Sequence, residues 1–226
     1  MRVTAFTPSI ARRLKSLCRR LGISDVFVER PSDVSIIAVL GNGALDAQAL
    51  TAVCSSLNHN SIVALVKPSE TRLAAVKYIR ILSEQYRKAK SFLFIIDQER
   101  DELSSLKDEL HSEVKKHFEV INGKWTDRWM KCTCRLGDKV LTLWLVINGL
   151  DEFSWRRHSI EDHMLKAAMS IGIRVEGDDP KVVWEALSEE DKHKVFARLI
   201  RSKSLVMEAF PQHVNALQSF KFLMQL

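Results

Sequence analysis

This sequence has few cysteines and no long apolar segment, and these absences limit the classes of protein to which it can belong. Only four of the 226 residues are cysteine, and they are unevenly spaced. That number and spacing do not suit a disulfide framework, so we expect a reducing, cytoplasmic environment. No stretch approaches the roughly 20 apolar residues that cross a bilayer. The first residues also lack the apolar core of a secretion signal, so we expect no membrane partner.

Several catalytic motifs are missing as well. The sequence has no Gly-x-Ser-x-Gly elbow and no cysteine in an obvious nucleophile context. Its one Gly-Asn-Gly segment, at residues 41–43, is expected to end a helix and not to follow a strand, so it does not form a phosphate loop. These absences argue against nucleotide hydrolases and dinucleotide-dependent oxidoreductases. The only tyrosines, Tyr78 and Tyr86, lie on one expected helix, which argues against a topoisomerase nucleophile.

Acidic residues are absent from residues 1–24, although the whole chain has a net charge of only +6. Leu14, Leu17, Cys18 and Leu21 recur at helical spacing, so we expect a basic amphipathic helix. Two interpretations remain open. The helix contacts phosphates and adds sequence-independent affinity for nucleic acid, or it packs on the core and its basic face is solvated. The basic residues of the segment are Arg2, Arg12, Arg13, Lys15, Arg19 and Arg20.

Strand-like and helix-like segments alternate through the first two thirds of the chain. Apolar runs predict strands at 26–29, 62–66, 92–96 and 140–147, and helical periodicity predicts helices near 32–41, 46–57, 73–86 and from 102 onward. The Gly-Asp pair at 137–138 predicts a hairpin. This order indicates an α/β fold with a mainly parallel open sheet, helices on both faces and a helical C-terminal extension. We divide the chain into a basic helix (1–22), an α/β domain (23–170) and the extension (171–226).

Acidic residues follow two of these predicted strands. Glu29 and Asp33 come after the strand at 26–29, and Asp97 and Glu99 come after the strand at 92–96. Parallel strands end at one edge of a sheet, which is where open α/β folds bind ligands. Clustered carboxylates at such an edge require neutralisation, commonly by a divalent cation. Asp33 has a second interpretation, because an acid after a strand often caps the next helix.

The two acidic segments together resemble the TOPRIM domain, in its stand-alone or OLD-nuclease-like branch. Val-Glu-Arg-Pro-Ser-Asp at 28–33 is similar to the first motif, Asp97-Gln98-Glu99 to the second, and His158-Ser159-Ile160-Glu161 to a later acid on a helix. The resemblance implies a Mg or Mn cofactor, with Asp97 and Glu99 as ligands and Glu29 as ligand or general acid/base. The full ligand set that it implies is Glu29, Asp33, Asp97, Glu99 and Glu161. Arg30 replaces the usual glycine, where it either contacts phosphate or blocks the site.

Three functions are therefore compatible with the sequence. The first is a small metal-dependent nuclease acting on DNA or RNA. The second is a catalytically inactive TOPRIM-like module that binds nucleic acid or nucleotide, and the third is a receiver-like or small-molecule enzyme whose acids serve another purpose. For either of the first two we expect a nucleic-acid surface formed by Arg12, Arg13, Lys15, Arg19, Arg20, Arg30, Arg156 and Arg157.

Overall fold

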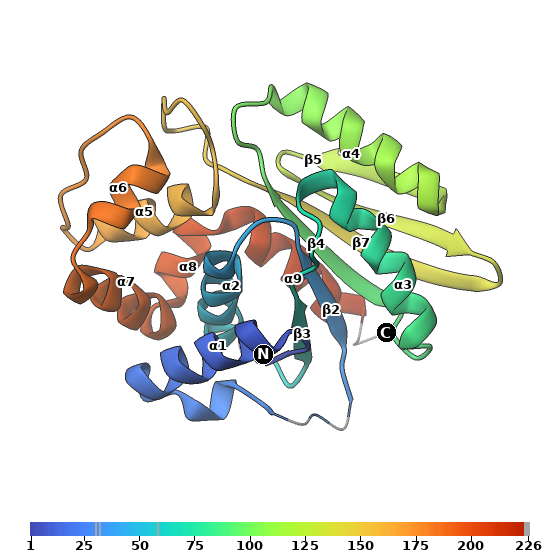
Figure 1. Ribbon diagram of the computed structural model, residues 1–226, viewed down its shortest axis with the longest axis horizontal. Coiled ribbons are helices and arrows are strands. Elements are labelled where there is room, and N and C mark those ends of the chain that lie inside the picture. The colour runs from blue at the N-terminus through green and yellow to red at the C-terminus, as the bar shows by residue number, and fades with distance from the viewer. Residues whose placement is uncertain (30, 32, 58, 224–226) are drawn as a thin grey trace.

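A seven-stranded sheet forms the centre of the computed structural model, which describes residues 1–29, 31, 33–57 and 59–223 (Figure 1). The strand order is β1-β3-β2-β4-β7-β6-β5. The first five strands in this order are parallel, whereas β6 and β5 are antiparallel to their neighbours, so the expected mainly parallel α/β fold is confirmed. The strands are β1 (Arg2–Ala5), β2 (Ile36–Leu40), β3 (Ile62–Val66), β4 (Ser91–Asp97), β5 (Glu119–Thr126), β6 (Trp129–Leu136) and β7 (Lys139–Asn148).

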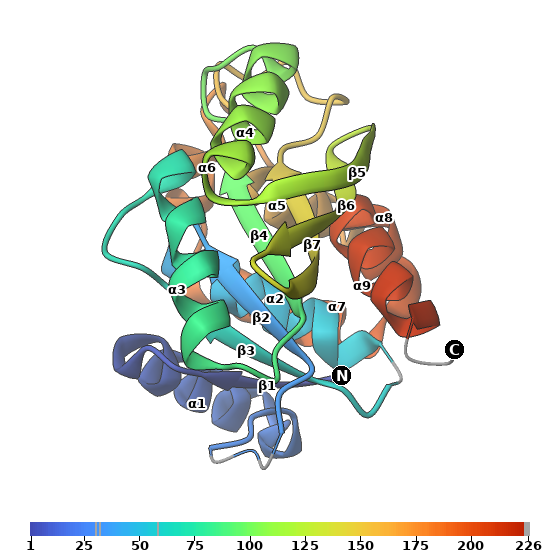
Figure 2. The ribbon, with the colours of Figure 1, turned by 90° about the vertical axis from the view of Figure 1, so that its right-hand side faces the viewer.

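Helices cover both faces of this sheet, as expected (Figure 2). Side chains alternate along each strand, so that in β2 Ala38 and Leu40 face one core and Ile37 and Val39 face the other. One face carries the 3-10 turn η2 (Arg72–Val76) with α3 (Lys77–Gln85) and α4 (Leu103–His117). The other face carries α1 (Pro8–Leu21), α2 (Ala44–Ser56), α5 (Ile160–Ser170), α6 (Pro180–Ala186), α7 (Glu189–Arg201), α8 (Lys203–Ala209) and α9 (Pro211–Leu223).

Two neighbouring predictions were wrong. Residues 26–29 do not form a strand, because Ser24–Val26 is a 3-10 turn and Phe27 makes only an isolated bridge to Val3 of β1. The predicted helix at 32–41 is instead the buried strand β2. A five-residue apolar run fits a buried strand and a buried helix turn equally well, and pairing with β3 and β4 decides between them. Ser32, the first residue of that predicted helix, lies outside the described residues.

The remaining strand predictions agree with the structure. The runs at 62–66, 92–96 and 140–147 are β3, β4 and β7, and β6 turns into β7 at Gly137, whose φ is 57°. Strands β1 and β5 were not expected. Helices α5 to α9 share one core with α1 and α2, and the three-part division of the chain stays a prediction. Among the described residues, no helix has the length and apolar character needed to span a membrane.

The connections around β2 and β4 create the setting for a site. These two strands are adjacent and parallel. Helix α2 follows β2 on one face of the sheet, while α4 follows β4 on the opposite face. The chain therefore leaves the sheet in opposite directions at neighbouring carboxyl ends, which is the topological switch point where ligands bind in open α/β sheets.

Candidate functional site

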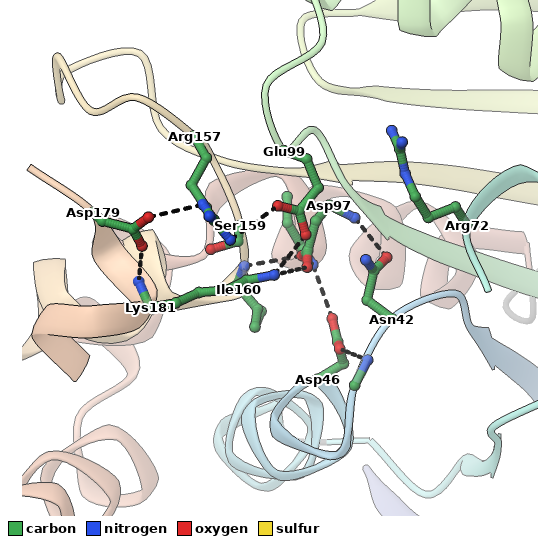
Figure 3. A network of polar contacts seen from close by, with 12 residues as sticks. Asn42, Asp46, Arg72, Asp97, Glu99, Arg157, Ser159, Ile160, Asp179 and Lys181 are labelled. Carbon is green, nitrogen blue, oxygen red and sulfur yellow. Dashed lines mark hydrogen bonds and ion pairs between the residues drawn. The ribbon is translucent and has the colours of Figure 1, made fainter. Parts of the chain in front are cut away.

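Three polar side chains meet at this switch point (Figure 3). Asp97 ends β4 beside Asn148, which ends β7, and both are buried. Asp97 Oδ1 accepts hydrogen bonds from Asn148 Nδ2 (2.8 Å) and the Ile160 N–H (3.0 Å). The same Asn148 amide donates to Asp46 Oδ1 at 2.9 Å. Asp46 lies in the first turn of α2, where its Oδ2 accepts the Gly43 N–H at 2.6 Å.

The turn between β2 and α2 is fixed against β4. Its first residue, Gly41, donates its N–H to Ile95 O at 2.8 Å. A Cβ at Gly41 would lie 2.5 Å from Ile96 Cγ2, so only glycine permits this approach. The next residue, Asn42, accepts the Asp97 N–H on its Oδ1 at 2.9 Å. These contacts hold Asp46 and Asp97 in register.

Glu99 lies at the open side of the same edge with a strained backbone. Its φ is 60°, and it exchanges two backbone hydrogen bonds with His158, at 2.7 and 2.8 Å. Arg72, at the start of η2, also has a positive φ of 54°. Left-handed conformations in non-glycine residues cost free energy and concentrate at functional sites. The Glu99 carboxylate contacts Lys181 Nζ (2.5 Å) and Arg157 Nη1 (3.7 Å).

Burial and repulsion raise the pKa of three carboxyl groups at this edge. Burial raises the pKa of Asp46 to about 6, and the nearby Glu161 charge adds to the effect. The pKa of Asp97 lies well above its ordinary value, first because of burial and then because of Asp46. Burial also raises the pKa of Glu161, in the first turn of α5. The site therefore holds more carboxylate groups than its surroundings readily keep ionised.

One lysine supplies most of the opposing charge. Lys181 Nζ lies 3.8 Å from Asp97 Oδ2, in addition to its contact with Glu99. Burial lowers the pKa of Lys181, but the hydrogen bond to Glu99 and the charges of Asp97, Glu99 and Glu161 outweigh burial, so the pKa is raised. Arg157 is shared between Glu99 and Asp179, and its Nε lies 2.9 Å from Asp179 Oδ2.

The donor chemistry of this cluster fits a hard divalent cation, but the described arrangement of side chains does not yet form a binding site. Two buried oxygens, Asn148 Oδ1 and Glu161 Oε2, have no hydrogen-bond partner among the described residues. Oxygen ligands of this kind are those that Mg²⁺ and Mn²⁺ prefer. However, no three His, Cys, Asp or Glu side chains of the described residues are placed to hold a metal ion. The Lys181 ammonium instead contacts Asp97 and Glu99.

The structure brings together three of the five carboxylates expected from the sequence, Asp97, Glu99 and Glu161. It does not bring Glu29 to them. Glu29 follows the segment that borders β1, four strand spacings or roughly 19 Å from β4, and pairs with Lys15 of α1. Asp33 is exposed before the amino-terminal end of β2, and its Oδ1 accepts its neighbour's N–H at 2.8 Å.

The expected nucleic-acid surface is divided in the structure. Arg30 lies outside the described residues. Arg156 is exposed and pairs with Asp178 at 2.9 Å, whereas Arg157 belongs to the carboxylate cluster. The five basic residues of α1 are exposed on the helix surface, and they are Arg12, Arg13, Lys15, Arg19 and Arg20.

Sequence reasoning missed several residues of the cluster. Asp46 was missed because β2 was taken for a helix, although an acid in the first turn after a strand was a usable signal. Asn148 directly follows the apolar run at 140–147, which was a second signal. Lys181 gave no signal, because it reaches Glu99 across 82 positions of sequence. Arg128 gave no sequence signal either. It is a buried arginine whose Nη1 donates to Gln98 Oε1 at 2.8 Å.

Comparison with known proteins adds no family to this description. No protein-family model, no curated protein and no solved structure matches the chain.

Proposed function

We propose that the carboxyl edge of the sheet is a divalent-cation site for phosphodiester chemistry on nucleic acid. The observation that carries this proposal is the meeting of Asp46, Asp97 and Glu161 at one switch point with raised pKa values. Buried carboxyl groups that repel one another lower the stability of the fold, and carboxyl groups with raised pKa values at a ligand-binding edge favour a functional role over a structural one.

Asp97 and Glu99 are the central ligands in this proposal, with Asp46 and Glu161 beside them. Asp97 Oδ1 is held by Asn148 and the Ile160 N–H, while its Oδ2 lies 3.8 Å from the Lys181 ammonium. A bound Mg²⁺ or Mn²⁺ would polarise a phosphoryl oxygen and lower the pKa of a bound water. The Lys181 ammonium has to leave for the cation to bind, and its side chain, about 31% exposed, lies at the edge of the site.

Part of the TOPRIM resemblance supports this proposal, because its second motif, at 97–99, and its later acid, Glu161, lie at the site, whereas Glu29 of its first motif does not. In the TOPRIM pattern a Glu-Gly pair ends the first strand and an acid opens the next helix. Here Asn42-Gly43 follows β2 and Asp46 opens α2, while Asp97 and Glu99 follow β4 and Glu161 opens α5. Glu29 has no part in this arrangement.

A second function is favoured by two specific observations. The residue after β2 that corresponds to the TOPRIM glutamate is an amide, Asn42, and the Lys181 ammonium already neutralises Asp97 and Glu99. While the ammonium stays in place, no cation can bind there to activate a water, so nucleic acid would be bound without being cleaved. The second candidate is therefore a catalytically inactive module that binds nucleic acid or nucleotide.

Cleavage assays distinguish the two functions. Single-stranded and double-stranded DNA and RNA are incubated with the full chain and Mg²⁺ or Mn²⁺, and the variants Asp97→Asn and Glu99→Gln are compared with wild type. Glu29→Gln is the matched control, because it removes a sequence-predicted carboxylate that the structure places elsewhere. Removing a ligand is expected to lower the rate by about 100-fold or more, while the control keeps wild-type activity.

Two outcomes contradict the nuclease proposal. Equal cleavage by wild type and Asp97→Asn would assign the activity to a contaminant or another site. Metal-independent binding of oligonucleotide without cleavage by wild type would favour the inactive module.

A further inference from the structure

The loop between β7 and α5, at residues 149–159, carries two stacked aromatic rings. Phe153 and Trp155 lie parallel, with ring centroids 4.1 Å apart and an angle of 4° between the ring planes. Both side chains are partly exposed. The loop is the gold segment at the upper left of Figure 1. Aromatic rings that a loop leaves in contact with water form a candidate binding surface, because loops position binding residues and a ring offers a large rigid face.

The two rings differ in how they pack on the rest of the protein. Trp155 packs against the hydrophobic core that α5 shares with α1 and α2. Among the described residues, Phe153 packs against neither of the two hydrophobic cores. One face of the Phe153 ring lies on Trp155, so the opposite face is the side on which another planar group can stack. The packing of the core therefore explains Trp155 and does not explain Phe153.

Polar contacts hold the loop on both sides of the aromatic pair. Glu152 Oε2 contacts Lys166 Nζ of α5 at 2.7 Å. The Arg156 N–H donates to the Asp178 carbonyl at 3.2 Å. These contacts fix the backbone around Phe153, so its ring is presented in a defined position. A preorganised surface of this kind lowers the entropic cost of binding.

Both ends of the loop lie at the candidate site. The loop begins directly after Asn148 and ends beside Glu99, which exchanges backbone hydrogen bonds of 2.7 and 2.8 Å with His158. Figure 3 shows Arg157 of this loop near the Glu99 carboxylate. The three residues from His158 back to Trp155 span at most about 10 Å. A nucleic-acid strand with a phosphodiester at Glu99 therefore lies within reach of the aromatic pair.

An unpaired base is the planar group that suits this position. Every nucleobase has a flat face that stacks on aromatic side chains, and such stacking tolerates any sequence. The bases of a duplex are already stacked on one another, and separating them costs free energy. An aromatic face beside a phosphodiester site therefore favours a single strand over a duplex.

We propose that Phe153 stacks an unpaired base beside the carboxyl edge of the sheet, so that the site takes single-stranded nucleic acid in preference to duplex. This inference names the substrate class of the proposed function and rests on it, in either its cleaving or its non-cleaving form. Trp155 supports the Phe153 ring from the other side. Both single-stranded DNA and single-stranded RNA present the required chemistry, because the contact is to the base.

A second stacked pair in the chain provides a matched control. Phe6 and Tyr86 have ring centroids 4.7 Å apart and an interplanar angle of 15°. Tyr86 is 41% exposed, but it precedes the amino-terminal end of β4, whereas the candidate site lies at the carboxyl-terminal end. Replacing Tyr86 therefore removes an exposed stacked ring without affecting the proposed contact.

The test compares three variants of the full chain with wild type. Phe153→Leu removes the ring and keeps an apolar side chain, Phe153→Tyr keeps the ring, and Tyr86→Leu is the control. Fluorescence anisotropy measures binding of labelled single-stranded DNA and RNA dodecamers and of the corresponding duplexes. The buffer contains CaCl₂, because Ca²⁺ also takes oxygen ligands, and gels verify that the strands stay intact. Thermal melts verify that each variant folds.

We expect Phe153→Leu to bind both single strands about 5–20-fold more weakly than wild type and the duplexes less than about 2-fold more weakly. Phe153→Tyr and Tyr86→Leu should stay within about 2-fold of wild type. Unchanged single-strand affinity in Phe153→Leu, an equal loss for duplexes, an equal loss in Phe153→Tyr, or tighter binding of duplex than of single strand by wild type would overturn the proposal. Absence of single-strand binding by wild type would also overturn it. Calorimetry with Mn²⁺ reports on the cation site separately, and Phe153→Leu should leave that affinity unchanged, so failure of base stacking and failure of the proposed function appear in different measurements.

Discussion

Replacing Asp97 by asparagine should stabilise the protein at neutral pH while removing its proposed metal site. The introduced amide would keep an oxygen that accepts from Asn148 Nδ2 and the Ile160 N–H, so the two short hydrogen bonds survive. What the variant loses is a charge that is buried and repelled by Asp46 and Glu161, together with the 3.8 Å ion pair to Lys181. The gain from removing the buried, repelled charge outweighs the loss of the ion pair, because the three carboxyl groups face a single nearby ammonium.

The size of the effect follows from the charge that the variant removes. Each unit by which burial and repulsion raise the pKa of a carboxyl group corresponds to about 1.36 kcal/mol, and the lost ion pair with Lys181 offsets part of the gain. We therefore expect a net stabilisation of about 1–2 kcal/mol. For a chain of this length, that gain raises the Tm by about 2–8 °C.

Thermal melts of wild type and Asp97→Asn from pH 4 to pH 8, with chelator present, provide the assay. A carboxyl group with a raised pKa binds its proton more tightly in the folded state, so stability is lost as pH rises from the unfolded pKa through the folded pKa. The difference in Tm between variant and wild type should therefore be small near pH 4, where Asp97 is protonated in the folded protein, and largest above pH 7. A constant difference across this range, or a variant less stable than wild type at pH 7.5, would refute the reasoning.

Three further predictions concern single residues. Lys181→Met should raise the affinity for Mn²⁺ about tenfold in calorimetric titration, because a competing cation is removed; unchanged affinity would show that the ammonium does not occupy the ion's place. Glu29→Gln should change neither Mn²⁺ affinity nor activity, and its Tm should move by less than about 1 °C, since its pair with Lys15 is exposed. Gly41→Ala should lower the free energy of unfolding by about 1–3 kcal/mol in urea melts, because its Cβ meets Ile96; a neutral result would contradict the close approach of β2 to β4.

The sequence predicts much of the sheet because its central strands are long apolar runs that end in turn signals. β4 and β7 are of this kind, and the hairpin before β7 has a glycine where a positive φ is needed. Prediction failed at β2, where Ile36–Leu40 is too short to show a period of two or 3.6 residues. The neighbouring run at 26–28 looked equally strand-like, but it only borders β1.

These two errors, a strand predicted at 26–29 and a helix predicted in place of β2, also changed the set of residues predicted for the site. Asp97 and Glu99 were identified because they follow a correctly predicted strand, and Glu161 because residues 158–161 resemble a TOPRIM motif. Glu29 was included because residues 26–29 were taken for a strand, and Asp46 was left out because β2 was taken for a helix. Lys181 enters the site only through the packing of α6 beside α5, and no local pattern reports a contact of that range.

The most direct test of the central claim is a crystal structure of the full chain soaked with MnCl₂, with anomalous scattering measured for manganese. The proposed function predicts an anomalous peak within about 2–2.6 Å of oxygens from Asp97 and Glu99, with the Lys181 ammonium displaced and Asp46 or Glu161 nearby. Crystals without a peak at this edge, in which Lys181 Nζ still contacts Glu99 at saturating manganese, would contradict the claim.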